Sequence, residues 1–226
     1  MSQINPRLNR VIAAFGYTFE RIDKNNTVLL IVDHQVGLFN LVKNYDPVQF
    51  KNNVLAHAEI AKVFSLPTVI TSSSETGPNG PILKEILDLH PDAPLIKRPG
   101  EVDAWDNVEF RAAVNATGKT QVIIASIATD VCTAFLALSL REAGYTVFHN
   151  SQASGTYSER VAKEANDRMR DAGVQNLSLF AIAADLMRDW RSTPGAPELI
   201  PFFDKYFPEY GVIARSYNAA RGQNQV

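Results

Sequence analysis

The sequence has only one cysteine, Cys132, among its 226 residues. A single thiol cannot form a disulfide within the chain, so a disulfide framework is excluded. Long apolar runs are also lacking, and none approaches the roughly 20 residues of a membrane span. The apolar stretch at 11–15 is too short and too closely flanked by charge for a secretory signal. We therefore expect a cytoplasmic protein with no membrane partner.

The chain lacks an excess of either charge, with 22 basic and 24 acidic residues and a formal net charge of −2. This balance gives no electrostatic basis for binding nucleic acid. A hydrophobic content of 46% excludes disorder as the main state and supports one large core. No G-x-G-x-x-G follows a predicted strand and no G-x-S-x-G is present. We therefore expect neither a dinucleotide cofactor nor a serine nucleophile elbow, and no cofactor of any kind.

Short apolar segments alternate with helical patterns along most of the chain. The segments that predict strands are 27–32, 67–71, 95–97, 121–126, 145–149 and 176–179. Helices are predicted at 48–64, 81–89, 107–117, 130–143, 158–172 and 180–190. This alternation predicts a three-layer α/β/α fold with a six-stranded, mostly parallel sheet.

Two terminal regions lie outside this alternation. We interpret residues 1–26 as an N-terminal arm and residues 27–226 as the domain, including its C-terminal tail. The tail after Pro194 is rich in proline and aromatic residues. Its aromatic side chains indicate packing, either on the domain itself or on another subunit.

Ligands of open α/β sheets bind at the carboxyl ends of the strands, and polar residues follow three of the predicted strands. Asp33 ends the first, Lys97 and Arg98 end the third, and Cys132 follows the fourth. Cys132 lies near the start of a predicted helix, where free N–H groups favour a thiolate, with Thr129 as the N-cap. Each residue also has an ordinary interpretation: a loop-capping Asp33, a solvated Lys97 and a small buried Cys132.

Several segments together resemble the isochorismatase-like cysteine hydrolases, in particular the YcaC-like subgroup. The resemblance covers about residues 27–215 and suggests the Rossmann-like fold of that family. The segments that carry it are LLIVDHQVGLF at 29–39, the stretch at 52–81, IKRPGEVDAWDN at 96–107, IIASIATDVCTAFLALS at 123–139, SQASGT at 151–156 and DRMRDAGV at 167–174.

The resemblance implies a catalytic triad of Asp33, Lys97 and Cys132. In such enzymes the aspartate takes the thiol proton, the lysine stabilises the ionised site, and the thiolate attacks a carbonyl to form a thioester that water hydrolyses. The resemblance also implies a cis peptide bond between Ile127 and Ala128 and an oxyanion hole made by the backbone N–H groups of Ala128 and Cys132.

The same resemblance implies a pocket wall that includes Gln35, Phe39 and Trp105. It further implies a homo-oligomer, with an octamer as the assembly typical of the subgroup. The expected function is hydrolysis of a C–N bond in a small amide or amide-like substrate.

Metal-dependent nicotinamidases of this family bind their metal through an Asp-x-His pair and further histidines after the second strand. Here that place is occupied by Thr71 and three serines, and the one Asp-x-His is Asp88-Leu89-His90. We therefore expect no metal. His34 is expected to be structural because strand alternation turns it away from Asp33, and Ser154 is expected in a turn.

Two other functions remain open from the sequence. Cys132 could be a redox-sensing thiol, although the chain lacks a second cysteine to resolve an oxidised one. The protein could also be an oligomeric binding protein that has kept the fold without the activity.

Overall fold

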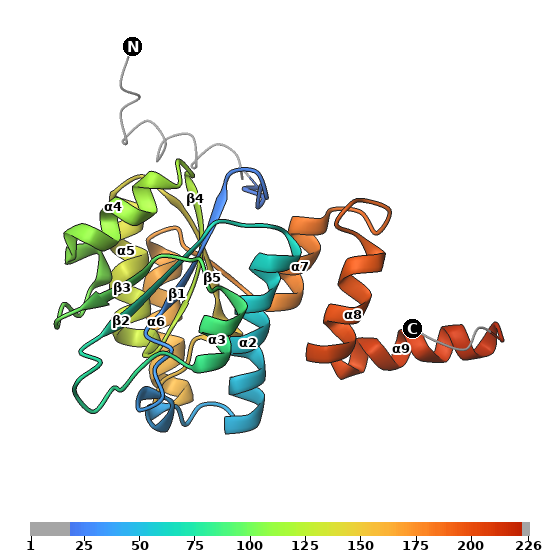
Figure 1. The fold of residues 1–226 in the computed structure, drawn as a ribbon, viewed down its shortest axis with the longest axis horizontal. Coiled ribbons are helices and arrows are strands. Elements are labelled where there is room, and N and C mark those ends of the chain that lie inside the picture. The colour runs from blue at the N-terminus through green and yellow to red at the C-terminus, as the bar shows by residue number, and fades with distance from the viewer. Residues whose placement is uncertain (1–18, 223–226) are drawn as a thin grey trace, which may run out of the picture.

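The computed structural model describes residues 19–222, in which six parallel strands form one sheet (Figure 1). Their order across the sheet is β3-β2-β1-β4-β5-β6, so the chain starts in the middle and winds outward in both directions. The strands are β1 (Thr27–Val32), β2 (Thr68–Ser73), β3 (Leu95–Arg98), β4 (Gln121–Ser126), β5 (Thr146–Asn150) and β6 (Gln175–Leu177). The predicted fold class is confirmed.

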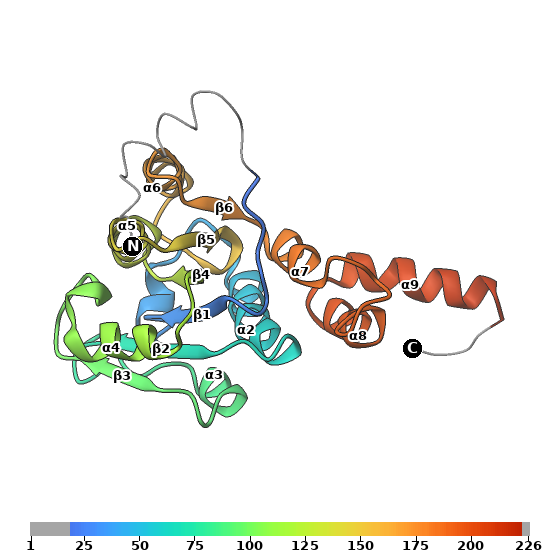
Figure 2. The same ribbon diagram turned by 90° about the horizontal axis from the view of Figure 1, so that it is seen from above.

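The central strands are buried on both sides because helices cover both faces of the sheet. Helices α4, α5 and α6 lie on one side and α2, α3 and α7 on the other (Figure 2). Every residue of β1 is buried, which explains its unbroken apolar sequence. The helices are α2 (Pro47–Val63), α3 (Lys84–Leu89), α4 (Val108–Ala116), α5 (Ala134–Glu142), α6 (Glu159–Asp171) and α7 (Leu179–Met187).

Most predicted boundaries agree with the structure to within a few residues, but the helix predicted at 130–143 has two parts. Its first turn is a π-helical segment, η3 (Thr129–Thr133), and regular α-helix begins only with α5. Such π turns are rare and often mark functional sites. Ala128 rather than Thr129 precedes the turn as N-cap, and it makes no side-chain capping bond. The expectation of a Thr129 cap was therefore wrong.

The C-terminal tail forms two helices that the sequence analysis did not predict, α8 (Ala196–Tyr206) and α9 (Pro208–Ala220). Helix α8 packs on α2 and α7 with Phe202, Phe203 and Tyr206 buried. Helix α9 projects away from the body of the protein (Figures 1 and 2). Part of the tail thus packs on its own domain, while most of α9 faces outward.

Residues 1–18 of the predicted arm lie outside the described residues. The last part of the arm packs against α7: Ile22 is buried, and its N–H donates to Asp185 Oδ2 at 2.7 Å. Between residues 19 and 222, no helix is both long and apolar enough to cross a membrane.

Candidate active site

Asp33 follows the last residue of β1 and is fully buried. Its backbone φ of 54° lies in the left-handed region, which is uncommon for a residue other than glycine. The turn is held from both sides, since the Asp33 N–H donates to Thr71 O at 2.9 Å and its own carbonyl accepts from Gln35 N at 2.8 Å. The strand end therefore fixes this carboxylate in an unusual backbone conformation.

Arg98, at the end of β3, is the cation that faces this carboxylate. Its Nη2 donates to both oxygens of Asp33, at 2.6 Å to Oδ2, and both side chains have no exposed surface. Nε donates to Thr71 Oγ1 of β2 at 3.0 Å and Nη1 to Glu101 O, so the guanidinium is held by three separate segments of the chain. An arginine held in this way is a fixed counter-charge.

Lys97, which was expected to complete the triad, is not brought to Asp33. Its ammonium pairs with Glu75 Oε2 at 2.8 Å, and its side chain is 62% exposed. The reason is strand alternation, because neighbouring residues of β3 point to opposite faces of the sheet. Ile96 and Arg98 are the buried residues of this strand. This period of two was available in the sequence, where Arg98 stands two residues after the apolar Ile96.

Cys132 lies in the η3 turn at the carboxyl end of β4, and its thiol lies beside the Asp33 carboxylate. The structure therefore brings Asp33 and Cys132 together, as the resemblance implied. Burial and the nearby Asp33 carboxylate raise the pKa of Cys132 to about 12, against weaker opposing effects of Arg98 and the Ala128 backbone. Burial also raises the pKa of Asp33, although Arg98 acts against this.

The raised pKa of Cys132 keeps the proton of the resting site on sulfur. The sequence favoured a thiolate, because a helix N-terminus and a cation both stabilise the anion. In the structure the Arg98 guanidinium is paired with Asp33 rather than with sulfur. The Asp33 carboxylate next to the thiol opposes the ionisation of Cys132. The Cys132–Asp33 pair is thus a thiol with an adjacent base.

The peptide bond between Ile127 and Ala128 is cis, as the resemblance implied. The backbone N–H of Ala128 lies close enough to Cys132 to act against the rise in the pKa of the thiol. Ala128 and Cys132 therefore lie together at the start of η3, where the expected oxyanion hole would be.

The three predicted pocket residues have other contacts in the structure. The Gln35 carboxamide binds the backbone of Ser73 twice, each at 2.9 Å, and also donates to Gly80 O. It therefore holds the loop after β2. Phe39 is half-buried and packs on Phe50, with ring centroids 5.2 Å apart.

Trp105 packs edge-on against Tyr145 and, with it, lines a cavity of about 430 Å³. That cavity also includes Thr120 and Gly144, which precede β4 and β5. Trp105 therefore packs toward the amino ends of the strands rather than toward Cys132.

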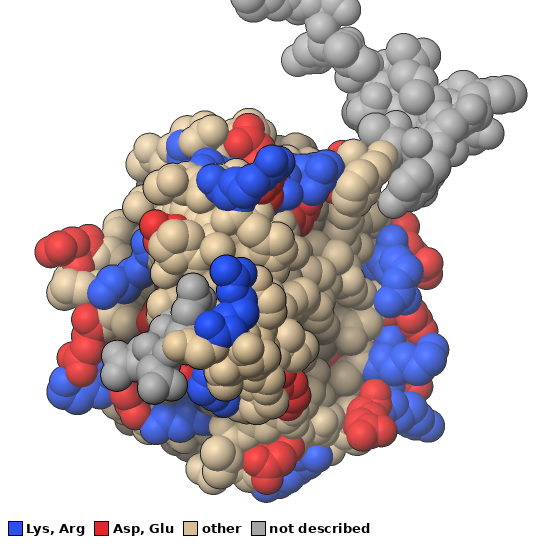
Figure 3. All heavy atoms as spheres, turned by 90° about the vertical axis from the view of Figure 1, so that its right-hand side faces the viewer, with Lys and Arg blue, Asp and Glu red and all other residues tan. Residues whose placement is uncertain are grey.

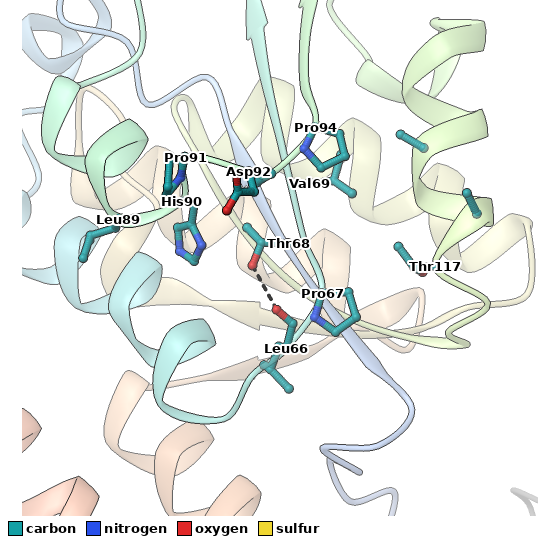
Figure 4. Close-up of a pocket in the computed structure, with 13 residues that line it drawn as sticks. Leu66, Pro67, Thr68, Val69, Leu89, His90, Pro91, Asp92, Pro94 and Thr117 are labelled. Atoms are coloured by element: carbon teal, nitrogen blue, oxygen red, sulfur yellow. Dashed lines mark hydrogen bonds between the residues drawn. The ribbon is translucent and has the colours of Figure 1, made fainter.

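A larger cavity, of about 490 Å³, also lies at the amino edge of the sheet (Figure 4). Its lining includes Pro67 before β2, Pro94 before β3 and His90 after α3. His90 Nε2 donates to Ala58 O at 2.8 Å, and Asp88 is paired with Lys84. Both members of the Asp-x-His pair are thus engaged, and within residues 19–222 no group of three His, Cys, Asp or Glu could hold a metal ion.

Comparisons with known proteins agree with this architecture. Residues 27–179 match the isochorismatase domain. The probable hydrolase YcaC of Escherichia coli is 47% identical over 205 residues, which cover 91% of this chain and 98% of that protein.

Two solved structures are also similar over nearly their whole length. The structure of Escherichia coli YcaC, an octameric hydrolase of unknown specificity, matches with a TM-score of 0.88 and 47% identity, over 91% of this chain and 100% of that one. YcaC of Pseudomonas aeruginosa, solved with hexane-2,5-diol and covalent acrylamide, matches with a TM-score of 0.87 and 45% identity, over 90% and 100%. The chain is therefore a hydrolase of the isochorismatase family.

Proposed function

We propose that this protein is a cysteine hydrolase that cleaves the C–N bond of a small amide or amide-like substrate through a thioester. The observation that carries the proposal is the thiol of Cys132 beside the buried Asp33, which is itself paired with Arg98. A nucleophile with an adjacent base that is itself held by a third group is the arrangement of covalent catalysis.

In the first half of the reaction, Asp33 accepts the thiol proton as sulfur attacks the carbonyl carbon. The raised pKa of the buried Asp33 makes it a stronger base than an ordinary aspartate. Backbone N–H groups of Ala128 and Cys132 hold the developing oxyanion. The tetrahedral intermediate collapses as the C–N bond breaks, and the leaving amine takes the proton from Asp33.

In the second half, water attacks the thioester carbon. Asp33 accepts a proton from this water and returns it to sulfur as the C–S bond breaks, which releases a carboxylic acid and restores the thiol. Arg98 takes no part in the proton transfers, and its guanidinium positions Asp33 and balances its charge.

The test is release of ammonia from a panel of small amides. The parent protein is expected to release ammonia from at least one amide, and Cys132→Ala and Asp33→Asn to lose this activity by at least a thousandfold, as in other nucleophile–base pairs. Lys97→Ala is the matched control, since its ion pair with Glu75 lies on the exposed side of β3. Equal activity in the parent and Cys132→Ala would contradict the mechanism.

We also propose that the chain assembles as an octamer, as its Escherichia coli relative does. Three side chains of α9 support this proposal, since Val212, Ile213 and Tyr217 are 53%, 63% and 57% exposed. Figure 3 looks onto the side of the C-terminal helices, where uncharged surface extends beside a basic side chain near the centre and most other charged side chains lie toward the edge of the view. Light scattering is expected to give about eight times the 25.0 kDa chain mass, and Ile213→Asp a smaller particle.

A further inference from the structure

The segment at residues 153–156, between β5 and α6, contacts both strand ends that carry the proposed catalytic residues. We call these four residues the bracket. Its sequence is Ala-Ser-Gly-Thr, and all four residues are buried. We propose that the bracket is a positioning element of the active site: through Ser154, and through His34 on the facing loop, it sets the placement of Asp33 relative to Cys132. The inference rests on the proposed function for the roles of Asp33 and Cys132.

On the Cys132 side, the bracket holds the end of β4 and the start of η3. Ser154 Oγ accepts the Ser126 N–H at 3.1 Å and donates to Asn150 O at 3.1 Å. One residue later, Gly155 pairs with Ile127 as a parallel bridge, and its carbonyl accepts from Thr129 N at 3.0 Å. These two hydrogen bonds to residues 126 and 129 and the bridge to Ile127 hold the entry to the turn that contains Cys132.

On the Asp33 side, the bracket is joined through His34. His34 Nε2 lies 2.8 Å from Ala153 O, and since a carbonyl can only accept, the ring carries its proton on this nitrogen. His34 is directly bonded to Asp33 in the chain and is fully buried. A change at Ala153 or His34 therefore shifts the turn in which Asp33 adopts its left-handed φ of 54°.

The bracket is itself fixed by close packing and by a third contact. A Cβ added to Gly155 would lie 2.6 Å from Val42 Cγ1 and 3.0 Å from Phe50, so only glycine fits there. Thr156 Oγ1 donates to Asp130 Oδ1 at 2.7 Å, within η3, and Thr156 N donates to Asn44 Oδ1 at 2.7 Å. Strand pairing aligns β1 and β4 only as far as Val32 and Ser126. Beyond those residues, the bracket contacts both strand ends.

The experiment measures the alkylation rate of Cys132 by acrylamide against pH, followed by mass spectrometry, together with a thermal melt. Asp33→Asn is the reference for a full loss of the interaction, because removal of the carboxylate removes a large part of what raises the pKa of Cys132. Ser154→Ala and His34→Leu are expected to move Cys132 away from Asp33. In both variants the pKa of Cys132 should fall part of the way toward its value in Asp33→Asn. Alkylation at pH 8 should then be about tenfold faster for each unit by which the pKa of Cys132 falls.

Conservative and matched variants separate positioning from stability. Ser154→Thr keeps the hydroxyl and His34→Gln keeps an N–H donor, so both are expected to restore the parent profile. Ser151→Ala is the matched control: this serine lies just before the bracket and also donates to a backbone carbonyl, Leu177 O at 3.1 Å, but contacts neither catalytic strand end. It should leave the pH profile unchanged.

Two results overturn the inference. The first is lowered melting of Ser154→Ala and His34→Leu with a parent-like pH profile, which assigns the bracket to stability alone. The second is equal effects of Ser151→Ala and Ser154→Ala. If Ser154→Ala shows no cooperative melt, the pH profiles of His34→Leu and His34→Gln are compared instead. The inference is then overturned if the two variants have the same profile. A parent profile that Asp33→Asn does not change would instead contradict the proposed function.

Discussion

Asp33 and Arg98 are fully buried as an ion pair, whereas His34, His57 and His149 are equally buried without charge. Each histidine donates one N–H to a neutral acceptor: His34 to Ala153 O, His57 to Leu30 O and His149 to Asn176 Oδ1. Burial lowers their pKa values to about 4, 3 and 4. Within residues 19–222, Asp33 and Arg98 are thus the only fully buried charges, each fixed beside the other, and the buried histidines are neutral.

The largest expected effect comes from removing one partner of the ion pair. Arg98→Met leaves the Asp33 carboxylate buried without a counter-charge and should lower the free energy of unfolding by about 3–5 kcal/mol. Urea denaturation measures this. The double variant Asp33→Asn with Arg98→Met removes both charges and should recover part of the loss. A double variant less stable than Arg98→Met alone would show that the carboxylate is not the source of the penalty.

The second effect is loss of stability in acid, caused by the neutral histidines. The pKa values of the three histidines in the folded state lie below the unfolded value of 6.5. Their contribution to the free energy of unfolding is therefore complete above pH 6.5 and is lost as the pH falls toward 4. Near pH 5 the three together should remove roughly 4 kcal/mol per pH unit. The raised pKa of Asp33 acts in the opposite direction, as a single group.

Denaturation curves between pH 7 and 5 test this, and the slope should exceed that of one titrating group. His149→Gln keeps a hydrogen-bonding amide and removes one of the three protonations, so it should flatten the slope by about 1.4 kcal/mol per pH unit. An unchanged slope in His149→Gln would assign the acid sensitivity to other groups.

The third effect concerns the thiol of Cys132, which lies next to the ion pair but is itself uncharged. Asp33→Asn removes the carboxylate that opposes ionisation of Cys132 and leaves Arg98 in place, so the Cys132 pKa should fall well below about 12. The dependence of acrylamide alkylation on pH reports it directly, because the chain has no other thiol. A curve identical to that of the parent would mean that Asp33 and Cys132 do not interact.

The smallest effect is expected at Lys97, one residue from Arg98. Its ion pair with Glu75 is 62% exposed on the lysine side, and exposed pairs contribute about 0–1 kcal/mol. Lys97→Ala should therefore change neither the urea midpoint nor the Cys132 profile beyond that amount. A loss similar to that of Arg98→Met would reverse the assignment of the two neighbouring cations.

The sequence was sufficient for the sheet because buried parallel strands are nearly continuous apolar runs, and 27–32 and 121–126 were predicted to the residue. The sequence was also sufficient to predict that Asp33 and Cys132 lie at the same edge of the sheet, since they follow the carboxyl ends of the adjacent strands β1 and β4. It misplaced the cation because two basic residues stand side by side and only the direction of each side chain separates them. It missed α8 because Pro201 lies inside the helix, where proline normally breaks the pattern.

The protonated state of Cys132 has a consequence for its fate in a cell. Hydrogen peroxide and other mild oxidants react with thiolates. A pKa near 12 instead of the ordinary 9 leaves roughly a thousandfold less thiolate at a given pH. A sensor of oxidants requires the opposite. The resting thiol therefore reacts more slowly with oxidants than an ordinary thiol does. Under the proposed mechanism, sulfur becomes a strong nucleophile only when a carbonyl carbon is in place and Asp33 takes its proton.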